Sequence, residues 1–182
     1  PDHSGIEFCL DNGIMNGTGA DTFSPDDTIT RAQFATMFYR FAGQPQADGN
    51  SKFTDLTQDW YKKAVCWAAA NGILNGTGDT TFSPNEVITR EQIAAIFYRY
   101  AQSKGLDVSL DDSEISSALA GYNDFADISD YAKIPVAWCF DENVMFIHSL
   151  TGYEYAIYPK VAPSRADTAT MFWKFSYVMN NN

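Results

Sequence analysis

Two stretches of this chain repeat one another, and they decide how it folds. Residues 12–40 read NGIMNGTGADTFSPDDTITRAQFATMFYR, and residues 71–99 read NGILNGTGDTTFSPNEVITREQIAAIFYR. They align without a gap at a separation of 59 residues, so that Arg31 corresponds to Arg90. A period of this length, kept through a loop, a proline and a helical pattern, indicates a duplicated structural unit.

A more divergent third copy follows the first two. The segment VAWCFDENVM around Trp138 matches VCWAAANGIL around Trp67, and PSRADTATMFWKF further on matches ITREQIAAIFYRY. Trp138 follows Trp67 by 71 residues, whereas Arg165 follows Arg90 by 75. A four-residue insertion therefore separates the two parts of the third copy.

The spacing predicts three repeats that together form one compact module. We place them at residues 1–43, 50–105 and 122–178, with an acidic linker at 106–121. The first repeat begins close to its own helix, whereas the second has the additional opening FTDLTQDWY. We therefore expect the chain to be part of a larger secreted protein.

The composition excludes several classes of function. Twelve lysines and arginines stand against 23 aspartates and glutamates, which gives a formal net charge of −11. Nucleic-acid binding needs a basic surface, so we expect no nucleic-acid partner. No apolar run approaches the ~18 residues that a membrane-spanning helix needs, so we predict no membrane span.

The three cysteines are interpreted as packing residues. Cys9 and Cys139 occupy equivalent repeat positions, at which the second copy has Ala68. This pattern is typical of a small apolar position between packed helices, and a Cys9–Cys139 disulfide is the alternative. No cluster has the spacing of metal ligands, and we predict neither a metal nor another cofactor.

Each repeat has the pattern of a helix, a loop and a second helix, which predicts an all-α fold. In the second copy we expect Asp59 to cap a first helix that runs to about Asn71, where Gly72 ends it. In the third copy Pro135 falls inside the expected first helix, which predicts that this helix begins late or is kinked. The linker contains one further candidate, a short helix at residues 114–120.

The second helix of the first two copies begins with a capping box. In this motif a hydroxyl accepts from the third helical amide, and the side chain three residues later accepts from the cap amide. The pairs are Thr30 with Gln33 and Thr89 with Gln92, and the third copy has the weaker pair Ser164 and Asp167.

An arginine follows the cap in all three copies, as Arg31, Arg90 and Arg165. Capping does not explain it, because a cation in the first helical turn opposes the helix dipole. One interpretation is a salt bridge to a carboxylate of this acidic chain. The other is an anion site, at which the guanidinium and free helix amides converge on a carboxylate or phosphate.

Together these motifs resemble the S-layer homology (SLH) domain, and the resemblance covers nearly the whole chain. In the second copy its elements are Trp67, Asn71-Gly72, Gly76, Gly78, Phe82, Pro84 and the ITREQ helix start at 88–92. The resemblance implies a pseudo-threefold spindle, in which the first helices form a central bundle, the second helices lie outside and grooves open between neighbouring units. The family tethers exported proteins noncovalently to the bacterial cell wall by binding secondary cell wall polysaccharide, often ending in pyruvylated N-acetylmannosamine.

The resemblance also implies a set of ligand-binding residues. The arginines would hold the acidic group, the glycines would let the backbone approach the sugar, and the tryptophans would wall the groove unless they pack in the core. The set is Arg31, Arg90, Arg165, Gly17, Gly76, Trp67, Trp138, Gln33 and Gln92. In the third copy Ile147 stands where the second has Gly76, and a β-branched residue does not readily adopt a positive φ. We expect grooves that depend on that loop to be blocked or altered.

The leading functional hypothesis is a noncovalent anchor that binds an anionic, pyruvylated cell-wall polysaccharide outside the bacterial cell, at its surface or S-layer. The alternative is a structural, self-assembling or protein-interaction module that has lost glycan binding. We do not expect an enzyme, because neither His3 nor His148 has a repeat-equivalent partner and no spacing singles out a pair of catalytic carboxylates.

Overall fold

The computed structural model describes residues 3–146 and 156–181 and divides the chain into two compact units. Unit 1 consists of Pro1–Ile88 and Pro163–Thr170, and unit 2 consists of Thr89–Ala162 and Met171–Asn182. Regular structure in the described ranges is helical, apart from two isolated β-bridges, which confirms the all-α class. Among the described helices, none has both the length and the apolar character needed to cross a bilayer.

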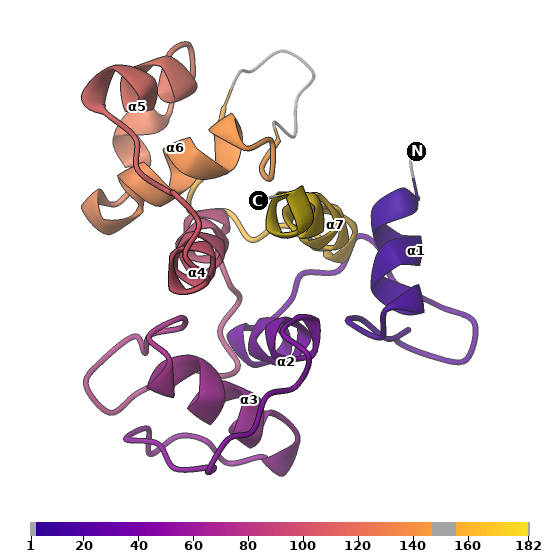
Figure 1. Cartoon of the computed structure of the whole chain (residues 1–182). Coiled ribbons are helices and arrows are strands. Elements are labelled where there is room, and N and C mark those ends of the chain that lie inside the picture. The colour runs from indigo at the N-terminus through magenta and orange to yellow at the C-terminus, as the bar shows by residue number, and fades with distance from the viewer. Residues whose placement is uncertain (1–2, 147–155, 182) are drawn as a thin grey trace. The chain divides into compact units, whose positions relative to one another are not determined.

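Unit 1 contains α1 (Ser4–Asp11), α2 (Arg31–Phe41), α3 (Asp59–Ala70) and the first turns of α7 (Arg165–Asn181). Helices α2 and α3 lie against one another (Figure 1). Trp67 of α3 packs against Phe38 and Tyr39 of α2, with ring centroids 6.4 and 5.5 Å away. The apolar face of the second helix in copy one therefore covers the first helix of copy two.

Helix α1 lies close to the first turns of α7. The thiol of Cys9 is 3.7 Å from the carbonyl oxygen of Ala169. A Cβ atom added to Gly5 would lie 2.6 Å from the Cα of Thr170, which is closer than side chains can approach. Gly5 is therefore needed for these two helices to meet.

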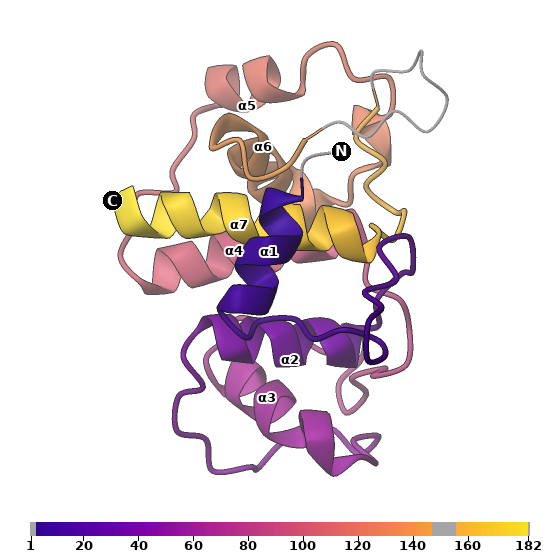
Figure 2. The same cartoon turned by 90° about the vertical axis from the view of Figure 1, so that its right-hand side faces the viewer.

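Unit 2 is built around aromatic contacts between α4 (Arg90–Ser103) and residues 171–181 of α7. The rings of Phe97 and Phe175 stack at 4.4 Å, and both side chains are fully buried. Helix α6 (Lys133–Asp141) packs on α4, and α5 (Asp112–Leu119) packs on α6, an arrangement visible in both Figure 1 and Figure 2. Two 3-10 turns, Phe125–Asp127 and Asp130–Ala132, connect α5 to α6.

The expectation that the second helices lie outside is wrong for unit 2. Helix α4, the second helix of copy two, buries nine of its 14 residues. The reason is that apolar residues cover more than one face of α4: Ile93, Ala94, Ile96, Phe97 and Tyr100 are all buried. A helix that is apolar on several faces is stable only where other elements cover it.

The helix boundaries refine three expectations. Asp59 is the first helical residue of α3, and Gln58 precedes it as a cap without a side-chain hydrogen bond. Helix α6 begins at Lys133, so Pro135 occupies its third position, where a backbone N–H has no helical acceptor to lose. The predicted late start is thus confirmed. The segment 106–121 contains α5, which starts earlier than expected because Asp111 and Glu114 form a capping box.

All three cysteines are buried and free, so the packing interpretation holds and the alternative disulfide is absent. Burial raises the pKa of the Cys9 thiol to about 12 and also raises the pKa of Cys66 and Cys139. Cys139 approaches the carbonyl oxygen of Ala94, much as Cys9 approaches Ala169. These thiols are therefore held neutral between helices.

We expect the native protein to react slowly with iodoacetamide at pH 7.5, because the thiolate is the reactive species and burial suppresses it. Alkylation after unfolding without a reductant should add three groups per chain, as counted by intact mass. A single added group would show that Cys9 and Cys139, or another pair, had formed a disulfide.

Candidate functional site

Arg31, the first of the three repeat-equivalent arginines, inserts into the loop of the second copy. Its Nε donates to the carbonyl oxygen of Phe82 at 2.9 Å, and its Nη2 donates to that of Asn75 at 2.7 Å. The guanidinium carbon lies 4.8 Å from the centroid of the Phe82 ring. Only 4% of the Arg31 surface is exposed. The planar donor fork thus joins the start of α2 to a loop more than 40 residues away.

Arg90 repeats this arrangement in unit 2. Its Nε donates to Ile157 O at 2.8 Å, and its Nη2 donates to Phe146 O at 2.6 Å. Ile157 stands where the other copies have the phenylalanine anchor, so the aromatic face is replaced by an aliphatic side chain. The two carbonyl acceptors are nevertheless retained.

Arg165, at the start of α7, contacts the loop of the first copy. Its Nε donates to Phe23 O and its Nη2 to Asn16 O, both at 2.8 Å, and its guanidinium carbon lies 4.6 Å from the centre of the Phe23 ring. Burial lowers the pKa of Arg165, and the neighbouring Asp27 carboxylate opposes that shift. Each of these three arginines therefore binds the loop of another copy, and Arg165 of copy three binds the loop of copy one.

The backbone at these helix starts makes the same connection. In α2 the amide of Arg31 donates to Glu86 O and that of Ala32 donates to Pro84 O, while the Gln33 amide donates to the Thr30 hydroxyl. Helix α4 repeats the pattern, since its first two amides donate to Val161 O and Pro159 O. The first two amides of α7 likewise donate to Asp27 O and Pro25 O. The prediction of free helix amides is therefore wrong, because protein carbonyls already accept from them.

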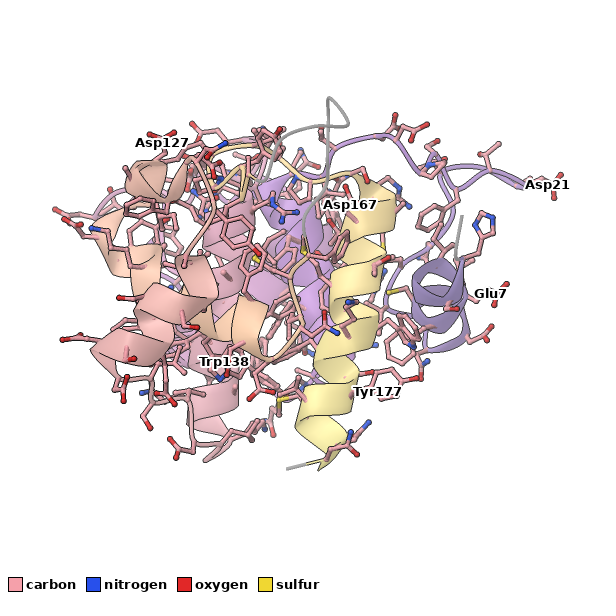
Figure 3. All side chains as sticks on the ribbon, turned by 90° about the horizontal axis from the view of Figure 1, so that it is seen from above. Glu7, Asp21, Asp127, Trp138, Asp167 and Tyr177 are labelled. Carbon is pink, nitrogen blue, oxygen red and sulfur yellow. The ribbon has the colours of Figure 1, made fainter. Side chains whose placement is uncertain are left out.

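The capping boxes are present as predicted. Thr30 with Gln33 and Thr89 with Gln92 each exchange both hydrogen bonds of the motif. Ser164 accepts from the amide of Asp167, which lies in the first turn of α7 (Figure 3), and its own amide donates to the Asp167 carboxylate. The side-chain oxygens of Gln33 and Gln92 thus act in capping, and a ligand contact by these residues stays a prediction.

Two aspartates, which the sequence reasoning missed, hold the loops that receive the arginines. Asp55 accepts from the amides of Phe82 and Ser83, and Asp124 accepts from those of Ile157 and Tyr158. Burial alone would raise the pKa of Asp55, but these amides and the charge of Arg31 hold it below its ordinary value.

The aspartates compensate a strained backbone. Ser83 and Tyr158 have φ values of 58° and 54° immediately before a proline, and Ser24 has 52°. A left-handed conformation costs a residue with a side chain about 1–3 kcal/mol, and it persists only where the surroundings hold it in place. The available sequence signal was an aspartate at the opening of the second and third repeats.

Gly17 and Gly76 are required by their own loops. A Cβ added to Gly76 would lie 2.4 Å from both Thr81 O and the Phe53 ring, and one added to Gly17 would lie 2.7 Å from Thr22 O. Neither glycine has a positive φ, so close approach of the loop to itself explains them. Ile147 lies outside the described residues, and sugar contact by Gly17 and Gly76 stays a prediction.

Trp67 and Trp138 lie in the cores of their units. Trp67 is 6% exposed, and Trp138 is 2% exposed against Tyr98 and Phe175. The indole N–H of Trp138, labelled in Figure 3, is buried without a hydrogen-bond partner in the part of the chain that the structure describes. Core packing accounts for both tryptophans, and a role as groove walls stays a prediction.

Unit 2 adds a buried ion pair at the same helix start. Glu91, 4% exposed, accepts from Lys160 Nζ at 2.7 Å, from the amide and hydroxyl of Ser129, and from the hydroxyl of Tyr131. Burial alone would raise the pKa of Glu91, but the hydrogen bonds from Lys160 and Ser129 hold it below its ordinary value. No group of three or more histidine, cysteine or acidic residues within 3–146 and 156–181 has a metal-binding arrangement.

Comparison with known proteins confirms the resemblance for the first two copies. Residues 1–35 and 52–94 match the S-layer homology domain. The chain is similar to an endoglucanase of Bacillus sp. (strain KSM-635), with 33% identity over 173 residues that cover 93% of this chain and 17% of the relative. It is also similar to a cellulosome-anchoring protein of Acetivibrio thermocellus, with 27% identity over 76% of this chain and 31% of the relative.

A third relative is a surface-layer 125 kDa protein of Lysinibacillus sphaericus, with 36% identity over 50% of this chain and 8% of the relative. The chain spans less than a third of the length of each of these three proteins.

Replacing Arg31 with alanine should lower the free energy of unfolding by about 2–4 kcal/mol, because two carbonyl acceptors lose their donors in a buried position. Arg31→Lys should restore only part of this loss, since an ammonium cannot donate in the same planar fork. Urea unfolding followed by tryptophan fluorescence measures both. The control is Arg40→Ala, which removes a single long contact to Ile14 O; equal stability of the two alanine variants would contradict the structural role.

Glu91→Gln should destabilise the protein by about 1–3 kcal/mol at pH 7, because it removes a buried charge and leaves Lys160 without its partner. The folded pKa of Glu91 lies below its ordinary value of 4.5, so its contribution is present above that pH and disappears as pH falls through the folded pKa. In acid unfolding, the wild type and the variant should therefore converge once the pH has fallen through the folded pKa of Glu91, which lies below 4.5. The exposed Glu86, changed to glutamine, serves as the control, and a pH-independent difference for Glu91→Gln would refute the assignment.

Proposed function

Because the first two copies of the repeat belong to the S-layer homology family, we propose that this chain is a noncovalent anchoring module of the bacterial cell surface. The family is an anchoring module rather than a catalyst, and the chain lies outside the cell. Among the relatives, the endoglucanase is matched over only 17% of its length. Similarity to this enzyme therefore reflects a small part of it, and we propose that the chain itself has no catalytic activity.

The ligand in this proposal is an anionic secondary cell wall polysaccharide, and a pyruvylated terminal sugar is the form that the family resemblance indicates. The observation that supports it is the same cation at the start of three helices. The carbonyl oxygens that accept from Nε and Nη2 of Arg31, Arg90 and Arg165 are uncharged. These contacts fix the position and orientation of each guanidinium, and its positive charge then attracts the carboxylate of the ligand.

The third copy keeps this feature although its loop has diverged. Arg90 reaches the carbonyl groups of Phe146 and Ile157 at 2.6 and 2.8 Å, like those that Arg31 reaches in the second copy. A backbone acceptor is available whatever side chain the position carries. We therefore propose that the arginine contribution to binding survives at this loop, whereas any contribution from the glycine loop of copies one and two is lost.

The alternative function, a structural or self-assembling module, is favoured by one observation. All three arginines already act within the chain, as the contacts that join helix starts to loops. If this is their entire role, the protein stays folded and associates with partners without recognising a glycan. The two functions differ in whether removal of the wall polysaccharide changes binding.

The test is sedimentation of the purified chain with cell-wall sacculi, before and after extraction of the wall polysaccharide. We expect extraction to abolish binding. Arg31→Ala combined with Arg90→Ala should weaken binding at least tenfold, which corresponds to about 1.4 kcal/mol or more. Since both variants are destabilised, binding is compared at a temperature where circular dichroism shows them folded, with Arg40→Ala as the matched control. Retention of the chain by extracted sacculi would refute glycan binding.

A further inference from the structure

The segment between the second and third repeats forms a feature that anchoring does not explain. Helix α5 lies on α6 and leaves a pocket of about 400 Å³ between α5, the turn at Phe125–Asp127 and the start of α6. Its walls include Ile115, Leu119, Tyr122 and Phe125, with Lys133 at its edge. Most of these side chains are apolar, and Phe125 is 55% exposed.

The surroundings of this pocket are strongly acidic. Residues 106–132 contain seven aspartates and glutamates and no lysine or arginine. Asp112 lies one helical turn before Ile115 and Ser116 on α5, and Asp127 lies in the same short turn as Phe125 and projects outward in Figure 3. Lys133, the one charged residue among the described residues that line the pocket, is paired with Asp130 at 2.8 Å. The negative charge lies beside the apolar lining, at Asp112 and Asp127, which form an acidic rim.

This combination of charge and shape selects among possible occupants. A membrane surface, a nucleic acid and an anionic wall polymer all carry the same sign of charge as the rim and are repelled by it. A second copy of the chain, with a net charge of −11, meets the same repulsion. A ligand with only a cationic group would leave the apolar walls exposed to water. A ligand with only an apolar group would make no electrostatic contact with the acidic rim.

We propose that the pocket between α5 and α6 binds a segment of a partner protein that carries an apolar side chain flanked by lysines or arginines. The apolar side chain enters between Ile115 and Phe125, and the flanking cations face Asp112 and Asp127. Burial of one aromatic side chain supplies the affinity, and complementary charge supplies selectivity and speed of association. The linker helix α5 and the start of the third copy then serve protein recognition, in addition to any glycan contact of the arginines.

The probe is a fluorescein-labelled heptapeptide with three lysines on each side of one phenylalanine, and its counterpart has glycine at the centre. Fluorescence anisotropy with the full chain should show about tenfold tighter binding of the phenylalanine peptide. Phe125→Ser should remove this preference. Tyr177→Ser is the matched control, because Tyr177 is 54% exposed on α7 and lies outside the pocket (Figure 3). Replacing Asp112 and Asp127 together by asparagine should weaken both peptides.

Three results would overturn the proposal: equal binding of the two peptides, equal effects of Phe125→Ser and Tyr177→Ser, or absence of binding. Equal peptide binding would identify attraction by charge alone. Because Phe125 is exposed, its replacement should leave the helical circular dichroism unchanged. Sacculus binding by Phe125→Ser should also be unchanged, so failure of this proposal is distinguishable from failure of the anchoring function.

Discussion

The structure depends on a buried guanidinium that donates to backbone carbonyl groups of a loop from another repeat. A buried cation is costly unless its donors are satisfied, and here the carbonyl oxygens satisfy two of them at 2.6–2.9 Å. The adjacent helix amides donate to the same loops. Each second helix is thereby fixed to a loop through both side chain and backbone, and arginine is suited to this because its donors diverge from one rigid plane.

This use of backbone acceptors explains how the third copy tolerates its divergence. The acceptor residue for Nη2 is asparagine in the loops of copies one and two and phenylalanine in that of copy three, and the anchor changes from phenylalanine to Ile157. The ring beneath the guanidinium is lost, but both carbonyl groups remain in place. Asp124 holds the altered loop by the same two amides that Asp55 holds in the second copy. The hydrogen bonds of the arginine therefore persist even where the loop motif that identifies the repeat has changed.

Much of the fold could be predicted from the sequence, because helix signals are local. The capping boxes at Thr30 and Thr89 and the late start caused by Pro135 depend on residues within one turn of each other. The same signal at Asp111 and Glu114 was present but was overlooked within an acidic segment. The burial of α4 was not predicted, since its face against Phe175 is completed by residues some 80 positions away.

The sequence identified the arginines of the candidate site, but it did not predict their hydrogen-bond acceptors. The repeats singled out Arg31, Arg90 and Arg165. The residues around a helix start, however, do not indicate which distant groups will accept hydrogen bonds from the arginines. Their acceptors come from loops between 44 and 149 residues distant, so the amides expected to be free are occupied. Likewise Gly76 was attributed to an unusual φ, whereas its cause is the approach of Thr81 and Phe53.

In this structure the three repeat-equivalent arginines are fixed by carbonyl groups of the chain itself. Nuclear magnetic resonance of the arginine Nε–H groups tests it most directly, through exchange with water and through scalar coupling across the hydrogen bond to the accepting carbonyl carbon. We expect slow exchange and measurable coupling for Arg31 to Phe82, Arg90 to Ile157 and Arg165 to Phe23, compared with Arg40 in the same spectrum. Exchange of all three as fast as that of Arg40, without coupling, would contradict it.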